Sequence, residues 1–148
     1  MSGGTHTVSA IATDSLGLST TLGAKTITVG NEPPFGSLDM VGDQKNGNTT
    51  IPQADVVAIV GWAADTQQGA PVTQVQVLID GAAVGNATLS LSRPDVSTAY
   101  NNSKYANAGY SFVYAGGYLT KGSHTAAVIA TDALGLSTTL GTKSFTIQ

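Results

Sequence analysis

The chain has 148 residues, a formal net charge of −3 and no cysteine. Charged residues make up 10% of it, and its five lysines and single arginine are scattered, which argues against the clustered basic surface of a nucleic-acid-binding protein. The lack of cysteine excludes disulfides and thiolate chemistry, and no apolar run approaches the roughly 20 residues that span a bilayer. Abundant Thr, Val, Gly and Asn favour strands and turns, so we expect an all-β protein.

The first predicted element is a hairpin that occurs twice. The segment HTVSAIATDSLGLSTTLG begins at His6, and HTAAVIATDALGLSTTLG begins at His124. A shift of 118 residues aligns 4–29 with 122–147, and 17 of these 26 positions are identical. Each copy alternates with period 2, turns at an aspartate followed by a glycine three residues later, and returns as a second strand.

A repeat period of this length is the size of a sandwich domain and exceeds that of a short solenoid unit. We therefore predict that residues 1–30 are the C-terminal hairpin of a preceding repeat, and that residues 31–148 are a complete domain. The start, Met1-Ser2-Gly3-Gly4, lacks the features of a leader peptide and is typical either of an engineered start or of a cut inside a longer protein.

Further strands are expected between the two hairpins. A stiff connector, NEPPFG, leads into the strand candidates FGSLDMV (35–41), DVVAIVGWAAD (55–65) and AGYSFVY (108–114). Residues 72–91 form the best hairpin pattern, because Asp80-Gly81 suits a tight turn. Ser92 and Asp95 have capping-box spacing and Pro94 suits a first helical turn, which predicts a short helical insertion. Two antiparallel sheets of about seven strands would bury these segments.

The order of the motifs resembles that of the bacterial Ig-like repeats of large surface and secreted proteins. The motifs are Pro34-Phe35-Gly36, Gly61-Trp62-Ala63-Ala64-Asp65, Val75 to Gly81, Arg93-Pro94-Asp95-Val96, Ala108-Gly109-Tyr110 and His124 to Gly135. The resemblance covers the second unit and, through the repeat, the first 30 residues. It implies an Ig-like antiparallel β-sandwich in a tandem array, with a spacer or adhesive role outside the cell or on its surface, and it implies no particular ligand.

No catalytic residues are predicted. His6 and His124 occupy equivalent places at the start of a repeated strand, which favours a structural role for both. The serines lack a nucleophile elbow, and the aspartates stand mostly beside Gly or Pro at strand ends, where they shape turns. We expect a protein that is not an enzyme.

The best candidates for ligand binding lie in the insertion at 92–108. Tyr100 and Tyr105 stand in an Asn-rich loop where folding does not obviously require aromatic side chains, and loops often carry function. Arg93 and Asp95 complete the candidate set for a glycan or protein ligand, although a local ion pair of Arg93 with Asp95 or another carboxylate is the simpler interpretation. Trp62 lies in an apolar strand and is expected in the core.

No cofactor is expected, with calcium as the weak alternative. Asp14, Asp65 and Asp132 could supply oxygen ligands near a domain junction, as occurs at the ends of extracellular sandwiches. The spacing D-x-D-x-D is absent from the sequence.

The preferred hypothesis is therefore a non-enzymatic structural or spacer module of an extracellular tandem array or fibre, and the alternative is an adhesion module that uses the loop at 92–108. A lone two-stranded hairpin is marginal in water, so the hairpin at 1–30 must fray, fold against the following domain or pair with another chain, and we expect a contact that orders it. Its partner would be a neighbouring Ig-like domain of the same chain or a copy of itself, joined by strand addition.

Overall fold

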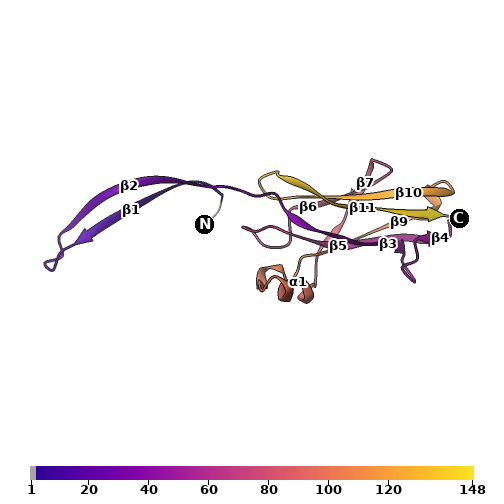
Figure 1. Cartoon of the computed structure of the whole chain (residues 1–148), viewed down its shortest axis with the longest axis horizontal. Helices are drawn as coiled ribbons and strands as arrows, with labels where there is room; N and C mark the ends of the chain where they lie inside the picture. Colours follow the sequence, from indigo (N-terminus) through magenta and orange to yellow (C-terminus); the bar gives the residue numbers. More distant parts are fainter. Residues whose placement is uncertain (1–2) are drawn as a thin grey trace. The chain divides into compact units, whose positions relative to one another are not determined.

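The structure, a computed structural model, describes residues 3–148. The chain divides into two compact units, one ending at Glu32 and the other spanning Pro33–Gln148 (Figure 1). Strands predominate in both units, which confirms the expected all-β class. Across residues 3–148, no helix has the length and apolar character needed to cross a membrane.

The first unit is a hairpin of two long antiparallel strands, β1 (Gly4–Thr13) and β2 (Ser19–Val29). Its turn forms because Oδ1 of Asp14 accepts the backbone N–H groups of Leu16 and Leu18, both at 2.9 Å. This is the turn that the aspartate and the glycine after it predict. The register shifts once, at a bulge beside Ala10.

The second unit consists of two sheets. One has the strand order β4–β11–β10–β6–β7 and the other β3–β5–β9–β8. All neighbours pair antiparallel except β4 and β11, which are parallel. The first sheet comprises β4 (Thr50–Ile51), β6 (Gln74–Ile79), β7 (Ala82–Asn86), β10 (Gly122–Thr131) and β11 (Ser137–Ile147). The second comprises β3 (Phe35–Asp43), β5 (Val56–Ala64), β8 (Thr88–Leu91) and β9 (Gly109–Ala115).

The second unit has nine strands where the sequence pattern predicted about seven. The predicted hairpin at 72–91 is divided, because the chain leaves the first sheet after β7 and joins the second sheet as β8. The two-residue strand β4 was not anticipated, since it is too short to show any periodicity.

The core lies between the two sheets. Its central side chains come from alternate positions of β5, β6, β10 and β11, as period-2 alternation predicts. The following are at most 3% exposed: Val57, Ile59, Val75, Val77, Ile79, Ala126, Val128, Ala130, Phe145 and Ile147.

The expected helical insertion is present as α1 (Pro94–Ala99), followed by the 3-10 turn η1 (Ser103–Tyr105). A second 3-10 turn, η2 (Gly116–Tyr118), follows β9. The capping box is wrong in detail: Arg93 is the N-cap residue of α1, and no side chain caps the helix. The carboxylate of Asp95 bonds to Arg93 instead.

Candidate functional site

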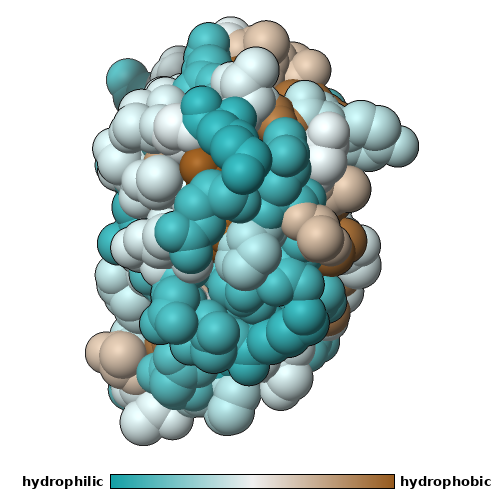
Figure 2. Space-filling model, turned by 90° about the vertical axis from the view of Figure 1, so that its right-hand side faces the viewer, coloured by the Kyte–Doolittle hydropathy of each residue, from teal (hydrophilic) through white to brown (hydrophobic). Residues whose placement is uncertain are grey.

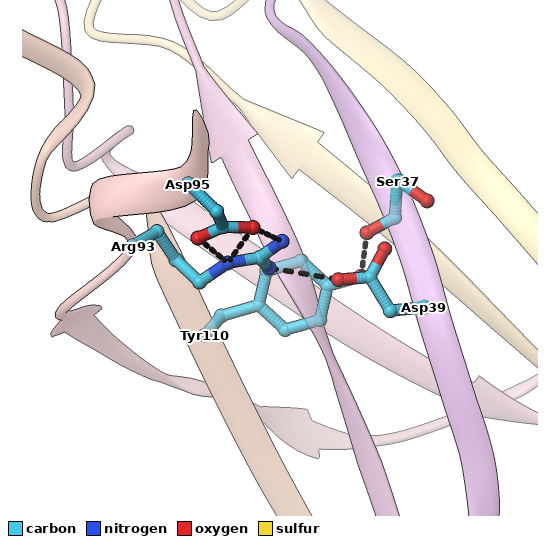
Figure 3. A network of polar contacts seen from close by, with 5 residues as sticks. All are labelled: Ser37, Asp39, Arg93, Asp95 and Tyr110. Atoms are coloured by element: carbon cyan, nitrogen blue, oxygen red, sulfur yellow. Dashed lines mark hydrogen bonds and ion pairs between the residues drawn. The ribbon is translucent and has the colours of Figure 1, made fainter. Parts of the chain in front are cut away.

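Arg93 places one guanidinium between two carboxylates at the start of α1 (Figure 3). Nε and Nη2 donate to the two oxygens of Asp95 at 2.7–3.1 Å, and Nη1 donates to Oδ2 of Asp39 at 2.7 Å. Hydrogen bonds from Arg93 lower the pKa of Asp95 to about 2, and the bonds to Asp95 and Asp39 raise the pKa of Arg93. Two carboxylates therefore surround one cation, so the guanidinium is not free to receive an anionic ligand.

The predicted local pair of Arg93 and Asp95 forms, and the structure adds Asp39. Asp39 lies on β3, 54 residues before Arg93 in the chain, so no local pattern could indicate it. The network ties the insertion to the edge of the second sheet. This arrangement supports a loop clamp, the simpler of the two interpretations of Arg93.

Tyr110 lies directly beside this network (Figure 3). Its hydroxyl donates to the backbone carbonyl of Ser37 at 2.9 Å, and its side chain is 1% exposed. Burial is the main cause of the raised pKa of its phenol. The ring crosses β5 at Gly61, where an added Cβ would lie 2.4 Å from the Tyr110 hydroxyl oxygen and 2.1 Å from the Ser37 carbonyl oxygen. Gly61 therefore makes room for a bond that links β9 to β3 across β5.

A shallow depression of about 270 Å³ lies against the same residues. Its walls include Asp39, Arg93 and Tyr110, together with Val60 and Leu91. The side chains of Asp39, Arg93 and Tyr110 that line it bond within the protein, as described above. Ser92 also lines this small surface recess.

Four aromatic side chains gather where the insertion meets the sandwich. Phe35, Trp62, Tyr100 and Tyr105 have ring centroids 5.4–5.8 Å apart in five pairs, edge-on or tilted. Such geometry favours aromatic packing. Val96 of α1 is buried in the same cluster. The cluster fixes the insertion to the sheet.

The two predicted binding tyrosines differ in exposure. Tyr105 is 5% exposed and belongs to the cluster core, whereas Tyr100 is 51% exposed. Of these two side chains, Tyr100 presents the larger surface to solvent. Trp62 packs against this smaller cluster and is partly buried, so it belongs to the satellite core and not to the main one.

The three calcium candidates each organise their own loop. Oδ1 of Asp132 accepts the backbone N–H groups of Leu134 and Leu136 at 2.8 and 2.9 Å, as Asp14 does in the first hairpin. Oδ1 of Asp65 accepts those of Gln67 and Gln68 at 2.8 and 2.6 Å. Within the described range of 3–148, no three His, Asp or Glu side chains group in a way that could hold a metal ion.

No sequence pattern indicated a contact between the buried His124 and the exposed Asp80. Nδ1 of His124 lies 2.6 Å from Oδ2 of Asp80, and Nε2 lies 2.8 Å from the carbonyl oxygen of Thr120. Asp80 also accepts the backbone N–H of Thr125 at 2.8 Å. The pair fastens the start of β10 to the β6–β7 turn, a structural role in keeping with the expectation for His124.

One face of the molecule is shown in Figure 2. It is largely hydrophilic, with hydrophobic side chains in separate small areas. The low content of charged residues therefore does not leave a broad apolar surface on this face.

No family model matches the chain, and no curated protein matches it significantly. Among solved structures, the chain is similar to fibronectin(III)-like modules of Clostridium thermocellum CbhA, with a TM-score of 0.51 and 17% identity. The similarity covers 99% of this chain and 63% of that one, so the chain spans less than two thirds of its length.

Two adhesin structures also match, at lower TM-scores. One is a Ca²⁺-stabilized adhesin that helps an Antarctic bacterium bind ice, with a TM-score of 0.43, 21% identity, and coverage of 98% of this chain and 32% of that one. The other is a 1.5-MDa bacterial ice-binding adhesin, with a TM-score of 0.42 and 22% identity. That match covers 98% of this chain and 42% of the adhesin chain. The likeness to the CbhA modules establishes the fold: the expected Ig-like sandwich is confirmed, and this chain has the sandwich architecture of fibronectin(III)-like modules.

Proposed function

We propose that the chain is a non-enzymatic structural module of an extracellular or surface-located bacterial protein built from tandem sandwich units. The observation that carries the proposal is the recurrence of one closing hairpin after 118 residues, with 17 of 26 positions identical. A tandem array is the simplest source of such a repeat, because each unit ends with the same element. The sandwich fold, which serves many functions, is compatible with this role and does not by itself assign it.

The polar groups of the second unit support a structural role. Arg93, His124 and Tyr110 all bond to loops or strands of the protein itself. Nucleophilic catalysis requires a nucleophile held beside a base in an accessible cleft. Arg93, Tyr110 and His124 have raised pKa values, and each of them holds loops or strands together. These side chains therefore stabilise the fold.

Surface location can be tested on intact cells of the source organism. Antibodies raised against the 148-residue chain should label unbroken cells, and external protease should remove the label while a cytoplasmic marker stays intact. Labelling that appears only after lysis, with no signal in the culture medium, would contradict the proposal.

A second candidate function is recognition of a glycan or protein by the insertion. It rests on Tyr100, which is half exposed and packs against Phe35 in the aromatic cluster. Aromatic faces in loops are suitable for stacking on sugars or apolar side chains.

An array of glycans probed with the full chain tests this candidate. Binding should be lost in Tyr100→Ala and kept in Tyr118→Ala, which removes another exposed tyrosine, 79% accessible, outside the insertion. Tyr105→Ala is a poor test because Tyr105 is buried and its loss would loosen the insertion. Absence of binding, or equal binding by both variants, would rule out recognition by the insertion, and the structural role would be the one that remains.

A further inference from the structure

The two hairpins are the same structure in detail. Their paired residues correspond one to one, from Gly4↔Val29 and Gly122↔Ile147 at one end to the turns at the other. Both carry a bulge at the same place, after Ala10 and after Val128. A threonine and a serine join hydroxyls at 2.8 Å beside each turn, and each turn glycine has φ of 85°.

In the second unit this hairpin is covered on both edges and one face. β10 pairs with β6 from Ala126↔Ile79 to Thr131↔Gln74, and β11 pairs with β4. The inward side chains are at most 2% exposed and are Ala126, Val128, Ala130, Phe145 and Ile147. The hairpin thus completes a sandwich whose remaining strands precede it in the chain.

The equivalent inward positions of the first hairpin keep the same chemistry. Val8 and Ala10 replace Ala126 and Val128, so the larger side chain moves two positions along the same face and the total volume is kept. Ile27 and Val29 stand where the second hairpin has Phe145 and Ile147, so all the central positions remain apolar. This pattern is typical of strands with one face packed on a core, and it is not expected of strands exposed on both faces.

These positions are open to solvent in the first hairpin. Val8 is 49% exposed, and Ile27 is 40% exposed. A shallow groove of about 320 Å³, lined by Val8, Ala10 and Leu22, surrounds Gly23. An added Cβ at Gly23 would meet nothing within 4 Å.

The second hairpin shows what fills such a groove. Gly141 is the equivalent of Gly23, and an added Cβ there would lie 3.2 Å from Cβ of Leu38 on β3. Leu38 is 4% exposed and belongs to the main core. The glycine is thus a close-approach position for an apolar side chain from the opposite sheet.

We propose that β1–β2 docks onto the body of another sandwich unit of this kind, one that lacks a last hairpin of its own and precedes β1 in the same polypeptide. This inference rests on the proposed tandem role. The edge of β1 pairs with a strand equivalent to β6, and the edge of β2 pairs with a strand equivalent to β4. An apolar side chain equivalent to Leu38 occupies the groove at Gly23, and His6 meets a carboxylate equivalent to Asp80.

A second copy of the chain does not suit this role. Its own sandwich body is already completed by β10 and β11, so both edges that β1–β2 would need are occupied. In the second unit the body also lies immediately before its hairpin, since β10 begins at Gly122, directly after Lys121. By the same order, the body for β1–β2 comes before the hairpin along the chain.

The test places a sandwich body in front of residues 4–148. Residues 33–121 are joined directly to Gly4, ahead of residues 4–148, so that the junction reproduces the Lys121–Gly122 bond. Hydrogen exchange should slow by about 100-fold or more at the amides of 8–13, because they gain a cooperative sandwich around them. The calorimetric unfolding enthalpy should become about twice that of the 148-residue chain, since this quantity scales with the number of folded residues.

Matched variants of the extended chain identify the docking face. Ala12→Asp places a charge at the equivalent of Ala130, which is fully buried, and should abolish the added protection. Ala24→Asp places the same charge at the equivalent of Thr142, which is exposed, and should leave the protection unchanged. Because Ile27 and Val29 are smaller than Phe145 and Ile147, a further version carrying Ile27→Phe and Val29→Ile restores the volume that this particular body needs.

The docking inference is wrong if the hairpin amides exchange as fast with the added body as without it, both in the extended chain and in its Ile27→Phe, Val29→Ile version. This outcome is independent of the cell-labelling result, which tests surface location. Slower exchange of the hairpin amides in either version supports the inference, provided that Ala12→Asp removes the added protection and Ala24→Asp does not. Light scattering on the 148-residue chain tests the source of the body. A discrete dimer that Ala12→Asp abolishes and Ala24→Asp retains would overturn the assignment to the same polypeptide.

Discussion

His124 and Asp80 form a charge-assisted pair that joins the start of β10 to the β6–β7 turn, with Nδ1 2.6 Å from Oδ2. Nε2 faces the carbonyl oxygen of Thr120 at 2.8 Å. Both ring nitrogens face acceptors, so both bonds form only when the imidazole carries two protons. The bond to Asp80 is the main cause of the raised pKa of His124, and the same bond lowers the pKa of Asp80.

This pair predicts a stability optimum in mildly acidic solution. A raised histidine pKa stabilises the fold fully below the unfolded pKa of about 6.5, and the gain is lost as pH rises through the folded pKa. The lowered pKa of Asp80 stabilises above about 3.9, and that gain is lost as pH falls through the folded pKa. Thermal melting should therefore give a higher Tm at pH 5.5 than at pH 8.5.

His124→Gln is the matched variant for the pH effect. It should destabilise the second unit by about 1.5–3 kcal/mol at pH 5.5, the range for a hydrogen bond to a charged group, and should reduce the difference in Tm between the two pH values. An unchanged pH dependence in the variant would show that other groups cause it.

Gly61→Ala should be among the most damaging single substitutions in the second unit. The new Cβ would lie 2.1 Å from the Ser37 carbonyl oxygen, so β3 and β5 would have to separate. We expect a loss of about 3 kcal/mol or more in urea unfolding, against about 1 kcal/mol for Tyr110→Phe, which removes only the hydroxyl bond. Gly30→Ala, with nothing within 4 Å, is the control and should be near neutral. Equal effects of Gly61→Ala and Gly30→Ala would refute the close approach.

The clamp around Arg93 can be measured through Asp95. Carboxyl titration by NMR should give Asp95 a pKa of about 2, because Arg93 donates to both of its oxygens. In Arg93→Gln the value should return towards 3.9. The contribution of Asp95 to stability is present above pH 4 and is lost as pH falls towards 2. A normal pKa for Asp95 in the unaltered chain would contradict the clamp.

Chelation should leave the stability of the chain unchanged. Asp14, Asp65 and Asp132 each bind backbone N–H groups of their own loops, which stabilises these loops without an ion. The Tm in excess EDTA should agree with that in millimolar calcium to within about 1 °C, the precision of such a scan, since no calcium-linked stabilisation is expected. A calcium-dependent rise in Tm that Asp65→Asn or Asp132→Asn removes would contradict this expectation.

The strands were predictable wherever burial imposes alternation on the sequence. Val75, Val77 and Ile79 on β6 show the period of 2 because one face of the sheet packs into the core. The turns at Asp14 and Asp132 were predictable because an aspartate that bonds the following backbone leaves a local signature.

The contacts between distant segments could not be predicted. Asp39 meets Arg93 across 54 residues, and Tyr110 reaches Ser37 across 73. These pairs depend on the register of strands in the folded sheets, which no single sequence window records. Tyr105 misled for the opposite reason: its polar neighbours indicate a surface loop, whereas the ring folds back onto Phe35.

The central claim is that two hairpins with the same strand pairing differ in what covers them. Hydrogen exchange on the unmodified 148-residue chain tests this claim at equivalent backbone ladders. The amides at Ala126, Val128 and Ala130 should exchange about 100-fold or more slowly than those at Val8, Ala10 and Ala12. The reason is that the second hairpin can exchange only when the whole sandwich around it unfolds. Equal protection of the two ladders would contradict the account.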